Sequence, residues 1–380
     1  MKKINLSILN ENLEKRIQND VDTNHILGAS VLVRQEGELL LEKSWGYADV
    51  AKTKALSEKA LFRIASMTKP VTGVAAMILV DRGLLDVDDK IEKYLPEFSN
   101  LRKGIIDENG EIRVLGKLEN PPTIKHILTH TTLIDYGELF KAQYKNYTDD
   151  IKADLHKAVD FYSSLVVEKE PGVMNSYSGT VAFDVLAVII EKITGRDYSE
   201  FLKNEIFVPL GMDDTTFTPS ASQRERMVQM HDLKDGQSVP GKTYEGCVFE
   251  NVPTSHPLGG AGLVSSVRDY DRFASMLVNG GILDGKRILS ENAVKLMATP
   301  PYPQLLNSSN RWGLSVRVID TENKIIPVGC FGWSGAYGTH FWVDPENKIT
   351  AVYMKNSQHD GGGGCITAKN FERDVVASMI

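Results

Sequence analysis

The sequence has few cysteines, and they are far apart. Cys247, Cys330 and Cys365 are the three cysteines among 380 residues. An odd number of widely spaced cysteines, without a C-x-x-C pair, indicates neither a disulfide framework nor a zinc site. We therefore expect reduced thiols, as in a cytoplasmic protein.

Long apolar runs are also missing. The longest candidate, residues 71–80, is shorter than the roughly 18 residues that span a bilayer. Near the N-terminus, Asn5, Ser7 and Asn10 interrupt the apolar residues, whereas a secretory signal needs roughly 7–15 apolar residues in a row. We expect an amphipathic helix over residues 8–20, no membrane span and a cytoplasmic location.

The sequence has no excess of basic residues. It contains 43 Lys and Arg against 50 Asp and Glu, which gives a formal net charge of −7 at pH 7. A chain with this balance, and with no cluster of basic residues, is poorly suited to a phosphate backbone or an anionic membrane surface. These absences leave a small molecule as the expected partner, and the oligomeric state stays open.

The two ends of the chain are strand-like, and the middle is helix-like. A hairpin is predicted from residues 28–33 and 39–45, with a turn at Glu36-Gly37. Further strands are expected at 312–319, 338–343 and 348–354, and helices at 66–81, 123–129, 181–194, 199–208, 270–279 and 368–380. This order predicts an α/β (α+β) fold in which both chain ends form one antiparallel sheet, flanked by helices and carrying a mostly helical insertion.

The length favours one catalytic domain with two closely packed parts rather than a single small core. We expect a sheet-containing subdomain made of residues 1–65 plus 235–380, and a mostly helical subdomain made of residues 66–234. No linker or internal repeat argues for separate domains over 1–380.

The chemistry is carried by Ser66-Met67-Thr68-Lys69. On a helix, residues i and i+3 share a face, so Lys69 is predicted to lie beside a Ser66 at the helix N-terminus. There the helix dipole favours a hydroxyl that loses its proton. A lysine exposed to water is mostly protonated, whereas burial disfavours the charged form and allows base catalysis. Alone, the tetrapeptide is a weak signal, because a capping serine and a solvated lysine give the same pattern.

Further segments strengthen the signal because they occur together and in one order. They are residues 61–69 (Leu-Phe-Arg-Ile-Ala-Ser-Met-Thr-Lys), 123–131 (Thr-Ile-Lys-His-Ile-Leu-Thr-His-Thr), Pro171-Gly172 with Tyr177-Ser178, Pro209-Leu210-Gly211-Met212, Gly259-Gly260-Ala261-Gly262-Leu263 and Phe331-Gly332-Trp333-Ser334-Gly335-Ala336. In this order the sequence resembles the serine β-lactamase and penicillin-binding-protein superfamily. The branch it resembles most is that of class C β-lactamases and family VIII carboxylesterases.

The resemblance implies a β-lactamase-like fold and a cofactor-free, metal-free acyl-transfer site. Ser66 would be the nucleophile, and Lys69 and Tyr177 would move protons. A phenol needs a nearby cation to lose its proton at neutral pH, and Lys69 would supply it. The backbone amides of Ser66 and Ala336 would form the oxyanion hole.

Two motifs depart from the class C pattern. The second motif is Tyr177-Ser178-Gly179, without the asparagine of Tyr-x-Asn, and the third is Trp333-Ser334-Gly335 in place of Lys-Thr-Gly. An aromatic plane thus replaces the cation that holds a substrate carboxylate. Family VIII esterases resemble the sequence in this tryptophan. Trp333, Ser334 and Gly335 are therefore candidate substrate-binding residues, together with Tyr136 and Tyr337, for which core packing is the equal alternative.

The leading hypothesis is a serine hydrolase that cleaves small, largely apolar carboxylic esters through an acyl-enzyme on Ser66. One alternative keeps the site but makes the protein an amidase, a D-aminopeptidase or a weak β-lactamase. Another is a non-catalytic binding protein that retains the pocket.

Two further motifs carry no function. The P-loop-like residues 236–243 lack a preceding apolar strand, so they do not indicate a nucleotide site. His126 and His130 lack a third metal ligand, so they do not indicate a metal site.

Overall fold

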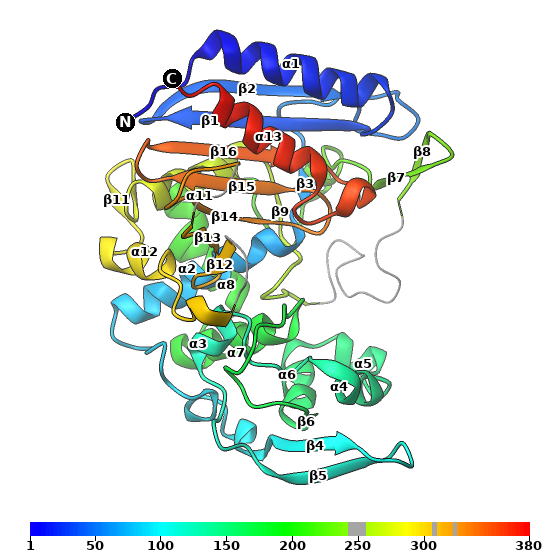
Figure 1. The fold of residues 1–380 in the computed structure, drawn as a ribbon, viewed down its shortest axis with the longest axis vertical. Helices are drawn as coiled ribbons and strands as arrows, with labels where there is room; N and C mark the ends of the chain where they lie inside the picture. Colours follow the sequence, from blue (N-terminus) through cyan, green and yellow to red (C-terminus); the bar gives the residue numbers. More distant parts are fainter. Residues whose placement is uncertain (242–255, 306–309, 322–324) are drawn as a thin grey trace.

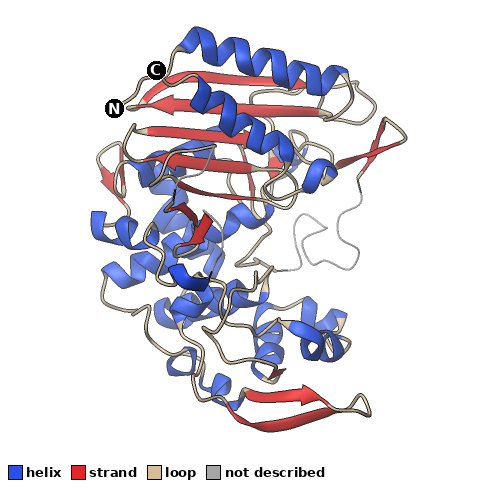
Figure 2. Cartoon of the chain, viewed as in Figure 1, coloured by secondary structure: helices blue, strands red, loops and turns tan. Residues whose placement is uncertain are grey.

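The computed structural model describes residues 1–241, 256–305, 310–321 and 325–380. Its ribbon has a sheet at one end and most helices at the other, and both termini lie at the outer side of the sheet (Figures 1 and 2). The predicted mixed fold, with an antiparallel sheet built from both chain ends, is confirmed.

The main sheet has seven antiparallel strands in the order β12-β13-β14-β15-β16-β1-β2. Their bounds are β1 (Gly28–Gln35), β2 (Glu38–Gly46), β12 (Asn310–Trp312), β13 (Arg317–Ile319), β14 (Phe331–Ser334), β15 (His340–Asp344) and β16 (Ile349–Met354). The pairing of β1 with β16 joins the two ends of the chain. Glu36 and Gly37 form the predicted turn and both have positive φ.

The strand expected over residues 312–319 is wrong in one respect, because it is broken between Gly313 and Val316 into β12 and β13. There the backbone donates to the helices instead of a neighbouring strand: Leu314 N–H to Met297 O at 2.9 Å and Ser315 N–H to Leu128 O at 2.7 Å. The break brings the sheet edge against the helical layer. Strand β14, which follows β13, was not among the strands predicted from the sequence.

Helices cover both faces of the sheet. The terminal helices α1 (Leu6–Asp22) and α13 (Ile366–Ala377) lie on one face, and α11 (Val267–Val278) packs on the other. The predicted first helix is confirmed, and its buried residues Leu9, Leu13, Ile17 and Val21 recur every four positions. Side chains of β15 alternate between two apolar clusters, with Trp342 in the terminal-helix cluster and Phe341 in the larger one.

The helical layer lies beyond α11. Its helices are α2 (Thr68–Asp81), α3 (Ile124–Leu128), α4 (Gly137–Tyr144), α5 (Asp149–Lys152), α6 (Leu155–Ser163), α7 (Val181–Thr194), α8 (Tyr198–Leu202), α9 (Val208–Leu210), α10 (Ala221–Arg224) and α12 (Glu291–Met297). Helix α7 has the predicted bounds and ends at Gly195, whose φ of 65° closes it with a left-handed cap. Thr123 caps α3 by accepting from His126 N–H.

Short strands complete the fold. They are β3 (Phe62–Arg63) with β9 (Val264–Ser265), β4 (Arg102–Ile106) with β5 (Ile112–Lys117) and β6 (Val166–Val167), β7 (His231–Lys234) with β8 (Gln237–Pro240), and β10 (Ile282–Leu283) with β11 (Lys286–Arg287). The described part of the P-loop-like stretch lies at the turn and second strand of the β7–β8 hairpin.

Within the described residues, no helix is long and apolar enough to cross a membrane. The two-subdomain boundaries stay a prediction.

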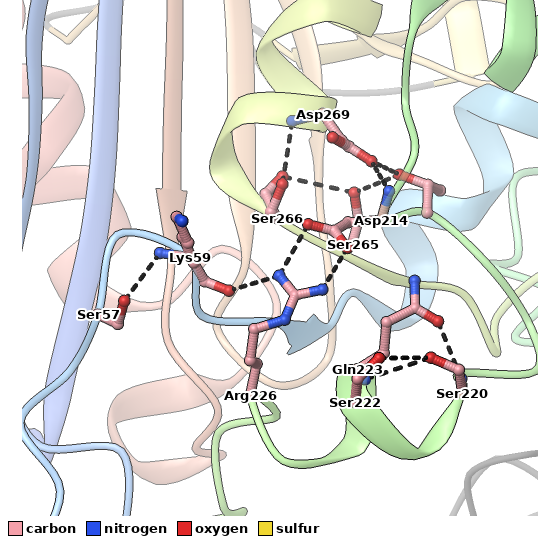
Figure 3. Close-up of polar contacts among 11 residues, drawn as sticks. Ser57, Lys59, Asp214, Ser220, Ser222, Gln223, Arg226, Ser265, Ser266 and Asp269 are labelled. Carbon is pink, nitrogen blue, oxygen red and sulfur yellow. Dashed lines mark hydrogen bonds and ion pairs between the residues drawn. The ribbon is translucent and has the colours of Figure 1, made fainter.

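A polar network holds the segment that leads into Ser66 (Figure 3). The Arg226 guanidinium donates to Asp214 Oδ2 at 2.8 Å and to Lys59 O at 3.0 Å. Arg226 also accepts the Leu61 N–H at 3.0 Å through its backbone oxygen. On the other side, β3 pairs with β9, so that Phe62 lies opposite Ser265. Backbone on both sides therefore fixes the chain four residues before Ser66.

We predict that α1 stabilises the fold through its buried stripe. Leu13→Ala removes a fully buried side chain and is expected to lower the free energy of unfolding by about 2–5 kcal/mol. Leu6→Ala makes the same change at a 45% exposed position of the same helix and is expected to cost less than about 1 kcal/mol. Urea unfolding followed by circular dichroism measures both, and equal losses would contradict the packing of α1.

A second prediction concerns Asp184, a buried carboxyl in the apolar helix α7. Burial raises its pKa from 3.8 to about 7, although Gly259 N–H and Lys69 act in the opposite direction. Between about pH 4 and pH 7 the folded protein thus holds a proton that the unfolded chain has released. This contribution to the free energy of unfolding falls as the pH rises through that window.

Asp184→Asn cannot titrate, so the difference in free energy of unfolding, variant minus wild type, is expected to increase from about pH 4 to pH 7. Asp160→Asn, which removes an exposed carboxyl on α6, is the matched control. Urea unfolding at several pH values checks both variants. A flat difference for Asp184→Asn would show that this carboxyl is ionised throughout.

Candidate active site

Ser66 lies in a single 3₁₀ turn, Ala65–Met67, that runs directly into α2. The residue before it, Ala65, has a φ of 43°, which is uncommon for any residue other than glycine. Such backbone persists only where the surrounding structure imposes it. Here Ile64 N–H bonds Leu263 O at 3.0 Å, and Ile64 O accepts from Thr339 Oγ1 at 3.1 Å. Ser66 therefore lies at the start of a helix, as the sequence predicted.

Lys69 is fully buried and lies one turn after Ser66. Its Nζ donates to Gly179 O at 2.5 Å and to Gly260 O at 2.8 Å, and lies 3.3 Å from Ser66 Oγ. These three contacts hold the nitrogen at a fixed place beside the Ser66 hydroxyl. Within the described residues no carboxylate forms an ion pair with Lys69.

Tyr177 reaches Ser66 from the opposite side. Its hydroxyl lies 2.6 Å from Ser66 Oγ, and Lys69 Nζ lies 4.9 Å from the centre of its ring. The side chain is 46% exposed, so its hydroxyl can meet both solvent and a bound molecule. The structure therefore brings Ser66, Lys69 and Tyr177 together, as the sequence predicted.

The residue after Tyr177 anchors this segment. Ser178 Oγ donates to Asp135 Oδ2 at 2.7 Å, and Ser178 N–H donates to His130 Nδ1 at 3.2 Å. Burial raises the pKa of Asp135 to about 6, although the bond from Ser178 lowers it. Burial, and secondarily the charge of Lys69, lowers the pKa of His130, which fits a neutral ring that accepts at Nδ1. His130 thus helps to hold the segment that carries Tyr177.

Asp184, on α7, binds the backbone of the segment that holds Lys69. Its Oδ1 accepts the Gly259 N–H at 2.8 Å, next to the residue whose carbonyl holds Lys69. Gly259 O accepts from Thr72 Oγ1 on α2 at 2.6 Å. The sequence analysis missed this residue, and the signal was a single charge within the apolar run of α7.

An aromatic wall stands beside Tyr177. The ring of Trp333 stacks on His130 at 5.5 Å between centroids and lies 4.8 Å from Trp312 and 6.3 Å from Tyr177. Trp333 is only 5% exposed, so it acts mainly by packing against the other rings of this wall. Trp312, which the sequence analysis treated only as the start of a strand, belongs to the same wall.

The third motif passes close to the nucleophile segment. A Cβ atom on Gly335 would lie 2.2 Å from Ile64 O, so only glycine allows this approach. Gly335 N–H bonds Thr339 O at 2.7 Å, which folds Ala336 and Tyr337 into the tight β14–β15 connection. Within the described residues, neither the Ser66 nor the Ala336 amide has a hydrogen-bond partner. Both remain candidates for the oxyanion hole.

The two tyrosines proposed for substrate binding are placed differently. Tyr337 is 1% exposed and packs with Ala65 and Met230, so its ring belongs to a small apolar cluster behind the nucleophile. Tyr136 is half-buried at the start of α4. Of the contacts in the described part of the chain, none joins Tyr136 to Ser66, Lys69 or Tyr177.

The cysteines take no part in this site. Cys330 and Cys365 are free and buried, and burial raises the pKa of the Cys330 thiol. Cys247 lies outside the described residues.

His126 belongs to a helix cap. Its Nδ1 accepts from Thr123 N–H at 3.1 Å, at the start of α3.

Known proteins resemble the chain over most of its length. Penicillin-binding protein 4* of Bacillus subtilis is 32% identical over 367 residues, which cover 93% of this chain and 74% of that protein. Esterase EstB of Burkholderia gladioli is 29% identical over 371 residues, covering 90% and 89%. The crystal structure of a family VIII carboxylesterase superposes with a TM-score of 0.75 at 18% identity, covering 98% and 97%, and shares the fold.

These similarities confirm the resemblance read from the ordered motifs. The sequence also matches the Beta-lactamase family over residues 13–370, which include every motif described above. The chain therefore belongs to the beta-lactamase family and is a serine hydrolase related to esterases.

Proposed function

We propose that the protein hydrolyses small, largely apolar carboxylic esters through an acyl-enzyme on Ser66. The observation that carries this proposal is the position of the Ser66 hydroxyl, 2.6 Å from the Tyr177 hydroxyl and 3.3 Å from Lys69 Nζ. A nucleophile needs a proton acceptor within hydrogen-bond reach, and this hydroxyl has two.

In the acylation step Ser66 Oγ bonds to the ester carbonyl carbon. Its proton passes to the oxygen of Tyr177 or the nitrogen of Lys69, the two groups within reach. The carbonyl oxygen becomes an oxyanion, and the amides of Ser66 and Ala336 would stabilise it. The tetrahedral intermediate then breaks its bond to the leaving oxygen, which takes a proton from Tyr177 and departs as the alcohol.

Deacylation repeats these steps with water. Water gives one proton to the Tyr177 and Lys69 pair as its oxygen bonds to the acyl carbon. The bond to Ser66 Oγ breaks, and Ser66 recovers its proton as the carboxylic acid leaves. The sum is ester plus water to acid plus alcohol, so no cofactor is consumed.

The preference for esters without a carboxylate rests on the third motif. Trp333 stands where the related class C pattern has a lysine, and it is packed against Trp312 and His130. An apolar wall binds apolar groups and provides no counter-charge. The similarity to Esterase EstB supports an ester substrate. Amide or β-lactam cleavage at this site remains the alternative, which a comparison of substrates would reveal.

We predict that Ser66→Ala abolishes ester hydrolysis. With p-nitrophenyl butyrate the initial rate is expected to fall by more than about 10³-fold, because no other group can form the acyl-enzyme. Ser164→Ala, an exposed serine at the end of α6, is the control. A loss below about tenfold would contradict the role of Ser66. Absence of labelling by a serine-directed phosphonate would favour a binding protein.

We also predict that Tyr177→Phe distinguishes leaving groups. If Tyr177 protonates the leaving oxygen, hydrolysis of ethyl butyrate is expected to fall by about 10²–10⁴-fold. Hydrolysis of p-nitrophenyl butyrate is expected to fall much less, because p-nitrophenolate leaves without a proton. Tyr144→Phe on α4 is the control for loss of an exposed phenol. Equal losses for both esters would show that Tyr177 acts in a step that both esters share, such as accepting the Ser66 proton, and not as donor to the leaving oxygen.

A further inference from the structure

A chain of buried hydroxyl groups leads from helix α8 to the segment that holds Lys69. The Tyr198 hydroxyl on α8 lies 2.6 Å from Thr72 Oγ1 on α2. Thr72 Oγ1 in turn lies 2.6 Å from the carbonyl oxygen of Gly259. Thr72 and Tyr198 are both 0% exposed, so solvent does not reach these hydroxyls. Neither side chain takes part in the proposed reaction.

The acceptors determine the direction of these hydrogen bonds. Thr72 Oγ1 is within reach of two carbonyl oxygens, Gly259 O at 2.6 Å and Thr68 O at 3.2 Å. A carbonyl oxygen only accepts, so the single Thr72 proton is donated to one of them, and the shorter distance favours Gly259. The Tyr198 hydroxyl must then be the donor toward Thr72. Burial raises the pKa of Tyr198, so its hydroxyl keeps that proton.

Asp184 on α7 holds Gly259 from the other side. Its Oδ1 accepts the Gly259 N–H at 2.8 Å. Side chains from α2 and α7 thus bond both backbone polar groups of one residue. Because a peptide group is planar, the bond from Thr72 to Gly259 O also fixes the nitrogen of Gly260. Gly260 O is the acceptor that lies 2.8 Å from Lys69 Nζ.

The segment Gly259-Gly260 needs this support because it has no side chains of its own. A Cβ atom on Gly260 would lie 2.7 Å from Gly179 O, which is the other acceptor of Lys69 Nζ. Only glycine permits this close approach, yet glycine leaves the backbone more conformational freedom than any other residue. The hydrogen bonds to Thr72 and Asp184 restrict that freedom at the point where the lysine is bound.

We propose that Thr72 and Tyr198 are positioning residues for Lys69. Through the Gly259-Gly260 segment they place its nitrogen beside the Ser66 hydroxyl. The inference rests on the proposed acyl-enzyme function and deepens it, because it assigns the placement of a proton-transfer group to two buried side chains outside the reacting groups. Loss of the Thr72 hydroxyl leaves a buried carbonyl and a buried phenol without their partner, so the segment that they hold is released.

The first test measures the chemical step apart from binding. Ethyl p-nitrophenyl butylphosphonate reacts once: Ser66 Oγ bonds to phosphorus, p-nitrophenolate leaves, and the serine proton passes to Lys69 or Tyr177. Thr72→Val removes the hydroxyl and keeps a similar shape. Its maximal rate of phosphonylation is expected to fall by about 10–10²-fold, because small misplacements of catalytic groups have effects of this size. The half-saturating phosphonate concentration is expected to stay unchanged, since Thr72 is fully buried.

Turnover of p-nitrophenyl butyrate gives the same comparison, with a lower kcat and an unchanged KM expected for Thr72→Val. Thr72→Ser keeps the hydroxyl and is expected to restore the wild-type rates. Thr350→Val is the matched control, because Thr350 is a buried threonine on β16 whose hydroxyl donates to Asp271. It is expected to lower the temperature of thermal unfolding, as Thr72→Val does, but to leave both rates unchanged.

A double variant tests the hydroxyl chain itself. Tyr198→Phe removes only the donor toward Thr72, so its loss of rate is expected to be smaller than that of Thr72→Val. Because Tyr198 acts through Thr72, adding Tyr198→Phe to Thr72→Val is expected to cause no further loss. Losses that multiply would show that the two side chains act independently and would overturn the chain.

Other outcomes would overturn the inference as well. Equal losses of rate in Thr72→Val and Thr350→Val would show a general structural effect. A raised half-saturating concentration with an unchanged maximal rate would assign Thr72 to substrate binding. If the wild type reacts with the phosphonate but hydrolyses no ester, the esterase proposal fails, and the phosphonylation rates still decide the role of Thr72. A wild type that does not react with the phosphonate would overturn both.

Discussion

The burial of Lys69 without a carboxylate partner is the constraint on which the site depends. The same molecule buries a second lysine, Lys355, in another way: its ammonium pairs with Asp360, and both side chains are almost fully inaccessible. At Lys69 the neighbours are two backbone carbonyls and the Ser66 hydroxyl. A carboxylate partner would hold the nitrogen in an ion pair. At Lys69 the carbonyls of Gly179 and Gly260 instead orient the nitrogen beside the Ser66 hydroxyl.

Those carbonyls must be held in place, and the packing of α7 holds them. A Cβ atom on Gly259 would lie 2.0 Å from Phe183 O, and one on Gly260 would lie 3.1 Å from Lys69 Nζ. The glycines therefore allow the backbone to approach both the helix and the lysine, and Asp184 accepts the Gly259 amide from within α7. A buried aspartate in an apolar helix is costly unless it is bonded or protonated, so its presence is explained by the segment that it positions.

Local patterns in the sequence predicted the parts of the site that are close along the chain. The spacing of Ser66 and Lys69 is a helical period, and α7 ends at Gly195 because a left-handed cap favours glycine. The partners of Asp184 and Thr72 in the glycine segment lie 75 and 187 residues away, so no periodicity points to them. The break between β12 and β13 was missed for the same reason, since its backbone bonds go to Met297 and Leu128 in other elements.

Strand β14 supplies two different surfaces from adjacent residues, because side chains alternate across a sheet. Trp333 faces the helical layer and Tyr177, whereas Ser334 faces His340 and α13. A slip of one residue in the pairing with β15 would exchange them and place the indole among buried polar groups. Gly332 opposes such a slip, since a Cβ atom there would lie 2.1 Å from Phe341 O and the close strand contact tolerates only glycine. The register of one strand thus sets both the apolar wall of the site and the polar contacts toward α13.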